Sequence, residues 1–329
     1  MVVRRYVAAI VAGLFALTSC ASSGDSGGEA GSLPKLKEKE SYTIGFAGQQ
    51  ADHPWTIAFN NSITEEIKKR GHKLVYTDAQ ASTAKQVENV ESLIAQKVDA
   101  IIITPREEKP LAEATLAARD AGIPVFIADR PVDDTIAKAG KDYVAYIGSD
   151  FYKEGQMSGE WLKKKMNSKG TIVELAGTTG SGPAKDRGEG FRKAIAGTDM
   201  EIIASQDGDF IRDKGRQAME TLIQQHPDVD AVFAHNDEMA LGAITALTAA
   251  GKTPGKDVTV VSVDGQKEAL QAIAAGKMGA TAECNPRFGP VVLDAIEAYG
   301  RGEKVEPKVM NKDKFFEKSN AAQNVATAY

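Results

Sequence analysis

Polar and aromatic residues directly follow short apolar runs at many points of the sequence. These stretches are 49–55, Thr104-Pro105, Asp129-Arg130, Ser149-Asp150, 177–181, His235-Asn236-Asp237, Asp264-Gly265 and Glu283-Cys284-Asn285. Carboxylates accept a proton from a hydroxyl group, whereas arginine and asparagine donate to its oxygen, and their planar forks can bind two neighbouring hydroxyls. Aromatic faces such as Trp55 and Phe210 can cover the apolar C–H side of a ring. This combination is the chemistry that a sugar pocket requires.

Helix capping is the alternative explanation for each of these polar residues taken alone. In a fold of alternating strands and helices, an aspartate or asparagine after a strand often caps the next helix. Five or six such residues that point at one crevice make capping a weaker explanation. His53 lies in the first stretch and could contact a ligand, although a lone histidine in a loop is more often simply solvated.

The elements that would position these residues follow from the hydrophobic pattern. From Tyr42 onward, short apolar runs alternate with longer segments of helical period, which is typical of parallel strands covered by helices. Ligands bind beyond the carboxyl ends of such strands, where the polar residues stand. We expect strands at 42–47, 73–77, 100–104, 125–128, 144–147, 171–175, 201–205, 231–234, 258–263 and 279–283. Two successive sets of strand–helix units, which meet near Gly148 and Asp150, predict two doubly wound lobes joined by a hinge.

Glycines predict where several helices end. Gly71, Gly122 and Gly251 each follow a segment of helical period, and glycine suits the left-handed position that closes a helix. In the segment 84–96, four aliphatic residues recur at helical spacing and would face a sheet. The segment 213–225 is likewise predicted to be an amphipathic helix and needs no functional interpretation.

The N-terminus has the pattern of an export signal. Arg4 and Arg5 precede an apolar run at 6–17, which is shorter than the roughly 20 residues of a membrane-spanning helix. Small residues follow, and the stretch ending in Cys20 resembles a bacterial lipobox, so we expect a signal peptide at 1–20 and a lipid on Cys20. Residues 21–40 are rich in Gly, Ser, Glu and Lys and predict a flexible tether.

Composition narrows the class of protein. The 329 residues are 42% hydrophobic and 26% charged, which suits a globular chain of two ordinary domains. The net charge of -5, without a basic block, argues against nucleic acid as a partner. The two cysteines lie in very different surroundings, so a disulfide is not expected, and Cys284 is interpreted as a small buried side chain.

Five long stretches identify a family resemblance. From about Tyr42 to the end, the chain resembles the type-I periplasmic binding proteins for monosaccharides, the ribose-binding group, and most closely its galactofuranose-binding members. The stretches that carry the resemblance are Ile127-Ala128-Asp129-Arg130, 173–175 through 186–191, Ser205-Gln206-Asp207-Gly208-Asp209-Phe210, Ala234-His235-Asn236-Asp237-Glu238-Met239 and Ser262-Val263-Asp264-Gly265.

The resemblance implies a ligand site built from both lobes. Its members would be Trp55, Asp129, Arg130, Arg187, Phe210, Asn236 and Asp264. Near the last hinge, Glu283 resembles the galactofuranose binders, and Asn285 lies on the same strand face and could serve instead. The loop at 47–54 departs from this group, and it shapes one wall of the pocket, so the identity of the sugar stays open.

The same resemblance implies three crossings between the lobes, near Gly148, Asn285 and Asn311. The N-terminal lobe would then comprise 41–148 and 286–311, and the C-terminal lobe 149–285 and 312–329. The expected protein is a monomeric, extracytoplasmic, lipid-anchored or periplasmic receptor that closes on a monosaccharide and presents it to the permease of an ABC importer. Neither a cofactor nor a metal is expected.

Three other functions remain as alternatives at this point. An enzyme is disfavoured because the sequence has no Gly-x-Ser-x-Gly or His-Glu-x-x-His motif, and His235 is more simply a packed strand-end residue than a base. A regulator of the lac-repressor type would need a helix-turn-helix where the signal peptide stands. A sugar sensor for a membrane histidine kinase or a chemoreceptor cannot be separated from a transport receptor by the sequence.

Overall fold

The computed structural model describes residues 33–51 and 53–329 of the chain. The predicted signal peptide, Cys20 and residues 21–32 of the predicted tether lie outside the described residues. Residues 33–40 were also assigned to the tether, but they lie against the folded unit. Leu36 is buried in the core, and the Tyr299 hydroxyl donates to the Pro34 carbonyl at 2.8 Å. The folded unit therefore begins several residues earlier than the predicted end of the tether.

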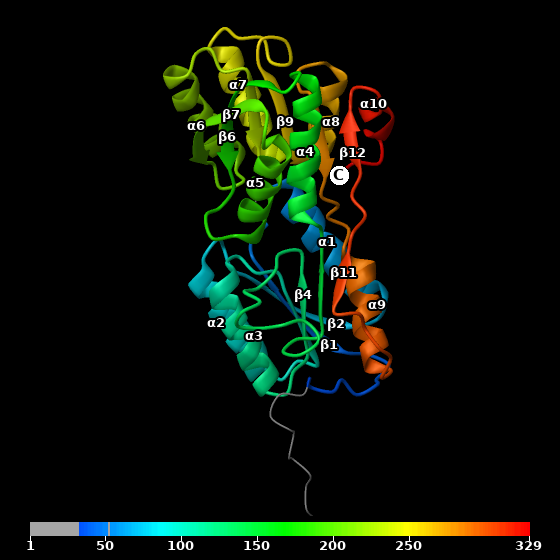
Figure 1. Cartoon of the computed structure of the whole chain (residues 1–329). Coiled ribbons are helices and arrows are strands. Elements are labelled where there is room, and N and C mark those ends of the chain that lie inside the picture. The colour runs from blue at the N-terminus through cyan, green and yellow to red at the C-terminus, as the bar shows by residue number, and fades with distance from the viewer. Residues whose placement is uncertain (1–32, 52) are drawn as a thin grey trace, which may run out of the picture. The chain divides into compact units, whose positions relative to one another are not determined.

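Two six-stranded sheets organise the folded unit (Figure 1). The first has the order β11 (Lys308–Met310), β5 (Ala145–Gly148), β4 (Val125–Ala128), β3 (Ala100–Ile103), β1 (Thr43–Gly48) and β2 (Lys73–Asp78). The second has the order β12 (Phe315–Glu317), β10 (Ala280–Glu283), β9 (Thr259–Asp264), β8 (Ala231–Ala234), β6 (Lys169–Ala176) and β7 (Asp199–Asp207). Every pairing is parallel except that of β10 with β12.

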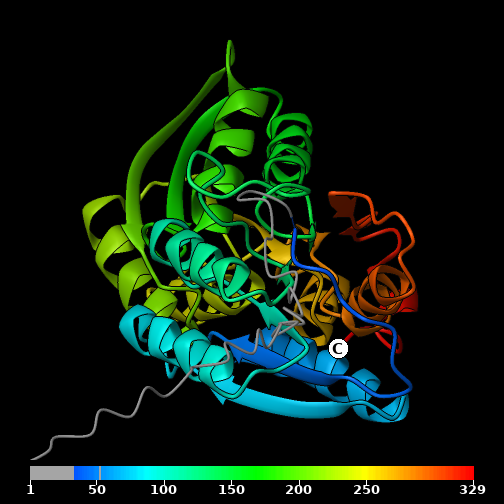
Figure 2. The same ribbon diagram turned by 90° about the horizontal axis from the view of Figure 1, so that it is seen from below.

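Helices cover both faces of each sheet (Figures 1 and 2). On the first sheet, α1 (Pro54–Lys69) and α9 (Gly289–Gly300) pack on one face, and α2 (Thr83–Ala95) and α3 (Glu108–Asp120) on the other. On the second sheet, α4 (Phe151–Lys165) and α5 (Gly182–Ile195) pack on one face. The other face carries α6 (Arg212–Gln225), α7 (Asp237–Ala249), α8 (Lys267–Ala274) and α10 (Ala321–Asn324). We call these two assemblies the first and second lobes.

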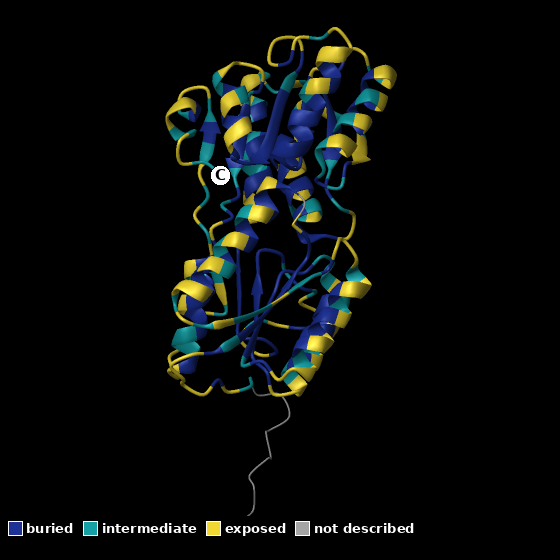
Figure 3. Ribbon diagram, turned by 180° about the vertical axis from the view of Figure 1, so that it is seen from behind, coloured by how far each residue is buried: buried dark blue, intermediate teal, exposed yellow. Residues whose placement is uncertain are grey.

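Central strands such as β3 and β8 are buried along their whole length, which explains why they are continuous apolar runs without polar alternation (Figure 3). Their register keeps the carboxyl ends level. Ala47 of β1 pairs with Ile103 of β3, and Ile103 pairs with Ile127 of β4. The residues that follow these strands therefore emerge at one edge of the sheet.

The architecture confirms the predicted fold class of two doubly wound lobes. All ten predicted strands are present, with ends displaced by at most two residues, and β11 and β12 were not predicted. Gly71, Gly122 and Gly251 have φ angles of +80°, +81° and +77°, as expected for glycines that close helices. The chain passes between the lobes after β5, after β10 and after β11.

Two glycines let α4 and α5 approach closely. A Cβ at Gly155 of α4 would lie 2.0 Å from the Arg187 carbonyl oxygen, and one at Gly190 of α5 would lie 2.0 Å from the Tyr152 carbonyl oxygen. Both distances are far below van der Waals contact, so only glycine permits this helix crossing. The crossing brings Arg187 of α5 beside the side chains of α4.

Among the described residues, no helix is long and apolar enough to cross a membrane.

Candidate ligand-binding site

A pocket lies where the strand ends of the two lobes meet. The space that it encloses is about 310 Å³, part of which is open to solvent. It is lined by His53, Trp55, Thr56, Asp129, Arg130, Phe151, Pro183, Arg187, Phe210, Asn236, Asp264 and Cys284. Seven of the nine residues predicted to bind ligand are therefore brought together here.

The first lobe contributes Asp129 and Arg130, directly after β4. Asp129 has a φ of +64°, and the Tyr146 hydroxyl donates to its carbonyl at 2.7 Å, which holds this unfavourable conformation. Burial raises the pKa of Asp129 to about 6, although the charges of Arg130 and Arg187 oppose the shift. Burial likewise lowers the pKa of Arg130 to about 10.

The Arg130 guanidinium lacks hydrogen-bond partners within the described part of the chain. Its Nε and Nη1 atoms are buried and donate to no protein atom. The nearest carboxylate oxygen, Oδ2 of Asp129, is 3.8 Å from Nε, which is too long for a hydrogen bond. Because buried charged donors are almost always satisfied, we expect these nitrogens to bind an acceptor other than the described residues.

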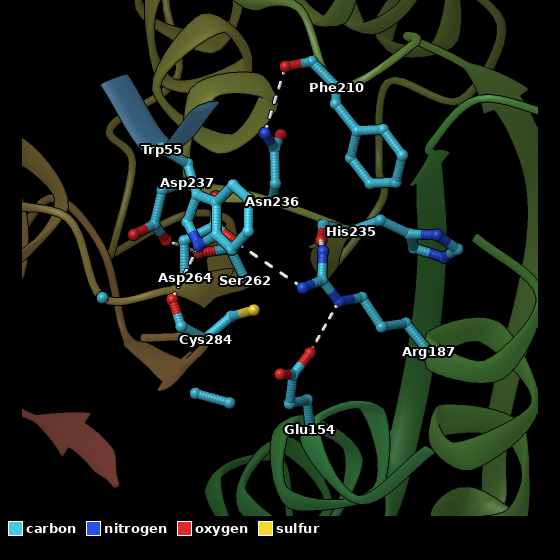
Figure 4. A network of polar contacts seen from close by, with 12 residues as sticks. Trp55, Glu154, Arg187, Phe210, His235, Asn236, Asp237, Ser262, Asp264 and Cys284 are labelled. Carbon is cyan, nitrogen blue, oxygen red and sulfur yellow. Dashed lines mark hydrogen bonds and ion pairs between the residues drawn. The ribbon is translucent and has the colours of Figure 1, made fainter. Parts of the chain in front are cut away.

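Arg187 of the second lobe is held on two sides, as Figure 4 shows. Its Nε donates to Glu154 Oε2 and its Nη1 to the His235 carbonyl, both at 2.8 Å. Its Nη2 lies 3.7 Å from Asp264 Oδ1, and both residues line the pocket. Burial alone would lower the pKa of Arg187, but Glu154 and Asp264 outweigh burial and raise it. The arginine is therefore fixed and fully charged.

Asn236 caps a helix and also has a donor available for a ligand, which are the two explanations that the sequence offered for such residues. Its side-chain oxygen accepts from the Met239 N–H at 3.0 Å and so caps α7. Its amide nitrogen donates to the Phe210 carbonyl at 3.0 Å. An amide has two N–H groups, so one remains for a ligand in the pocket that Asn236 lines.

Aromatic rings form the apolar walls. The Phe210 ring lies 5.3 Å from Arg130 Cζ and 5.9 Å from Arg187 Cζ, within the range of cation–π attraction. Trp55 stacks on Phe59, with ring centroids 5.2 Å apart, and its Nε1 donates to the Cys284 carbonyl at 2.7 Å. Phe210 therefore touches the arginines of both lobes.

Asp264 ends β9 with a φ of +130° and is buried. Burial raises its pKa well above the ordinary value; Arg187 opposes this shift and Asp237 adds to it. Three pocket residues, Asp129, Phe210 and Asp264, thus have positive φ angles. Backbone strain of this kind concentrates at ligand sites, where the surrounding structure enforces it.

The two candidates at the last hinge, Glu283 and Asn285, lie outside the pocket. Both line a separate surface groove, where Glu283 Oε2 accepts from the Lys314 N–H and the Asn285 side chain accepts from the Arg287 N–H. Successive residues of an extended chain point to opposite sides, so Cys284 between them faces the pocket.

Glu154 was missed by the sequence reasoning. It lies in the first turn of α4, where an acidic residue is ordinarily explained by the helix dipole. Its side chain is 1% exposed, and burial raises its pKa to about 7, although the neighbouring Arg187 opposes the shift. The sequence holds one weak signal for this contact, a carboxylate next to a glycine in a helix. Without knowledge of the helix packing, that signal does not identify a site.

A further network fixes His235, whose carbonyl holds Arg187. Gly177 N donates to His235 Nδ1 at 3.3 Å, so the ring proton is on Nε2 and is donated to Glu174 Oε1 at 3.1 Å. Burial lowers the pKa of His235, so the ring is neutral. Glu174 also accepts from Arg192 at 2.6 and 2.9 Å and from Ser205 Oγ at 2.6 Å.

The Glu174 network predicts a pH dependence of stability. Burial raises the pKa of Glu174, but hydrogen bonds from His235 and Arg192 outweigh it and lower the pKa from 4.5 to about 2. Its stabilising contribution is therefore present above pH 4.5 and disappears as the pH falls towards 2. We expect Glu174→Gln to lower the free energy of unfolding by about 1.5–3 kcal/mol at pH 7. In urea titrations the deficit should shrink as the pH falls below 4.5, and an unchanged deficit would contradict this account.

Substitution of Gly177 by alanine is expected to disturb the pocket alone. A Cβ at this position would lie 1.9 Å from Phe210 Cζ, so Gly177→Ala must displace the ring. We expect ligand affinity to fall roughly tenfold or more, since the ring covers both arginines. Calorimetric titration should also show that Gly177→Ala adds little to Phe210→Ala, whereas additive losses would mean that Gly177 acts elsewhere.

Comparison with known proteins agrees with this geometry. A family model described as a periplasmic binding protein domain matches residues 44–304. The ribose import binding protein of Bacillus subtilis is 35% identical over 297 residues, which cover 90% of this chain and 93% of that protein. The galactofuranose-binding protein of Escherichia coli is 38% identical over 262 residues, covering 78% of this chain and 81% of that protein. A solved structure from Mycobacterium smegmatis in complex with β-D-fucofuranose has a TM-score of 0.83 and 37% identity, with 87% of this chain and 94% of that chain covered.

The described residues contain no group of three or more His, Cys, Asp or Glu side chains placed to hold a metal ion.

The family model spans most of the chain, and the fold and pocket agree with it. The chain therefore belongs to the periplasmic binding protein family and is a binding protein rather than an enzyme.

Proposed function

We propose that this protein captures a monosaccharide, galactofuranose or a related furanose or pyranose, and delivers it to an ABC importer. The observation that carries the proposal is Arg130, which is buried between the lobes with two guanidinium nitrogens that donate to no atom of residues 33–51 and 53–329. A group so placed needs an acceptor, and the sugar oxygens would supply it.

The rest of the pocket supports a neutral, hydroxyl-rich ligand. Arg130 and Arg187 are matched by the carboxylates of Asp129 and Asp264, so an ionised ligand has no excess charge to pair with. The lining contains donors, on Arg130, Arg187 and Asn236, as well as the carboxylate acceptors, and a sugar hydroxyl uses both. Phe210 and Trp55 offer apolar faces for the ring. The relatives named for ribose and galactofuranose, and the fucofuranose complex, support a furanose or small pyranose.

Binding would proceed by closure of the hinge. Contacts between the lobes already involve pocket residues, with Arg130 of the first lobe over Phe210 of the second. At the hinge, the Asn285 N–H donates to Asp313 Oδ1 at 3.2 Å, and Asn311 Nδ2 donates to the Asn285 carbonyl at 3.5 Å. These bonds tie two of the crossing segments together, so they would move as one hinge.

The N-terminal pattern supports a lipid-anchored protein on the outer side of the membrane. The proposed signal peptide at 1–20 would be removed, and Cys20 would carry the lipid. Cys20→Ser should then release the exported protein from the membrane fraction. If the variant stayed in that fraction, the lipobox interpretation would be wrong.

The direct test is a thermal-shift screen of residues 33–329 against D-ribose, L-arabinose, D-galactose, D-fructose, methyl β-D-galactofuranoside, myo-inositol and a few amino acids. A ligand at about 100 times its Kd should add roughly 2.7 kcal/mol to the free energy of unfolding. A single sugar that stands out would support the proposal and name the cargo. If no sugar stabilises the protein but another compound of the screen does, the proposed substrate class is wrong. An adjacent permease gene would favour transport, and a histidine-kinase gene would favour sensing.

A further inference from the structure

A second cavity, which we call the outer groove, adjoins the ligand pocket along two stretches of the chain. It encloses about 2140 Å³, part of which is open to solvent. Arg130 lines the pocket, and the next residue, Pro131, lines the groove. Likewise Pro183 and Arg187 line the pocket, whereas Lys185 between them lines the groove. The two spaces therefore lie on opposite sides of one wall.

Phe151 is the part of this wall that faces both spaces. Among the described residues that line them, Phe151 alone belongs to the pocket and to the outer groove. It is the first residue of α4 and is 3% exposed, so protein encloses its ring between the two spaces. Elsewhere the lobes touch directly, because a Cβ added to Gly182 would lie 2.9 Å from Pro131 Cδ. Gly182 has no side chain to remove, so Phe151 is the part of the wall that a substitution can open.

The ring of Phe151 is held in place by Arg187. The Arg187 Cζ atom lies 5.2 Å from the centroid of the ring, within the range of cation–π attraction. Arg187 is itself fixed by its hydrogen bonds to Glu154 and to the His235 carbonyl, both at 2.8 Å. Asp150 caps α4 directly before Phe151, which fixes the backbone there. A ring held in this way is a static partition.

The outer groove has the chemistry of a second sugar subsite. Its lining offers carboxylates on Asp133 and Asp186, an ammonium group on Lys185 and the ring of Tyr143. Sugar hydroxyls use donors and acceptors together, and an aromatic ring can cover their C–H faces. A disaccharide or glycoside with its first unit in the pocket could place its second unit in the groove only if the side chain at position 151 were smaller.

We propose that Phe151 is a specificity-determining residue, which limits the ligand to one sugar unit by closing the pocket towards the outer groove. A side chain that clashes with a longer competitor excludes it without adding affinity for the preferred ligand. The proposal rests on the proposed function, because it requires a sugar in the pocket.

Phe151→Ala and Phe151→Leu test the proposal by a gain of binding. The probes are p-nitrophenyl β-D-galactofuranoside, p-nitrophenyl α-L-arabinofuranoside, sucrose, isomaltulose and lactose, each paired with the sugar of the screen above that it extends. Titration calorimetry gives the ratio of the two Kd values, extended compound over parent sugar. For the parent sugar that binds best, we expect this ratio to be about 100 or more in the wild type and to fall at least about tenfold in both variants. Affinity for the parent should fall by no more than about fivefold, because the attraction between the ring and Arg187 is lost.

Phe126→Leu is the matched control for a loss of buried aromatic packing. Phe126 lies in β4, is fully buried and lines neither the pocket nor the outer groove. Its truncation also removes core contacts, but its Kd ratio should stay within about twofold of wild type. Phe151→Leu keeps part of the apolar side chain, so it serves as the test if Phe151→Ala does not fold.

The possible failures have different results. A Kd ratio unchanged in the folded Phe151 variants overturns this inference, while binding of the parent sugar still supports the proposed function. An equal fall of the ratio in Phe126→Leu also overturns it, because looser packing would then explain the gain. So does a wild-type protein that binds the extended compound as tightly as the parent. A wild-type protein that binds no sugar overturns the proposed function, and this inference with it.

Discussion

Arg130→Ala is expected to abolish sugar binding without lowering the stability of the ligand-free protein. The guanidinium is buried when the lobes are closed, and two of its nitrogens have no partner among the described residues. If a sugar accepts from these nitrogens, as proposed above, binding loses a charged donor worth about 2–5 kcal/mol, or roughly 30- to 5,000-fold in Kd. The fold loses no hydrogen bond of Nε or Nη1, so the free energy of unfolding should be unchanged or slightly higher.

Titration calorimetry and urea unfolding measure these two effects separately. Arg301→Ala is the matched control, because Arg301 forms a surface ion pair with the exposed Glu303. Near-normal affinity in Arg130→Ala would remove the main support for the proposed function. A large fall in stability with lost binding would instead assign Arg130 a role in folding.

Arg187→Met is expected to lose binding and stability together. Its partners Glu154 and His235 belong to the interior of the second lobe, and the Glu154 side chain is 1% exposed. Removing one member of a buried ion pair leaves the other uncompensated, at about 3–5 kcal/mol. We expect the contrast with Arg130→Ala because Arg187 is bonded to Glu154 and His235, whereas Nε and Nη1 of Arg130 have no partner among the described residues.

A double variant separates the two losses. Arg187→Met with Glu154→Leu replaces the buried pair by apolar side chains of similar size, which is often neutral for stability. We expect urea unfolding to recover while calorimetry still detects no binding. Arg216→Met, at a surface pair with Glu220, should remain within about 0.5 kcal/mol of wild type. Failure of the double variant to recover stability would mean that Glu154 does not account for the loss.

Much of the site could be predicted because parallel strands end level. Asp129, Asn236 and Asp264 each follow a buried run, and the shared register of the strands brings such positions to one edge. The resemblance to monosaccharide binders added Arg187, which lies inside α5 and has no strand-end signal. Sequence pattern and family motif thus supplied different parts of the same pocket.

The remaining parts depend on packing that no local pattern records. The sequence analysis placed Glu283 and Asn285 at the ligand site, whereas Cys284 between them lines the pocket. Neighbouring residues of an extended chain point to opposite sides, so an error of one position exchanges the residues that face inward. Strands β11 and β12 have three residues each and are partly exposed, so they lack the apolar run that marks the others.

The three crossings also constrain how the chain can acquire its structure during synthesis. The first sheet gains its edge strand, β11, only at residues 308–310, and the second gains β12 only at 315–317. Neither lobe is a contiguous segment, so neither can be completed until nearly the whole chain has left the ribosome. A nascent chain of this topology therefore cannot complete its fold during synthesis. An incompletely folded chain is the form that can pass through a translocation channel.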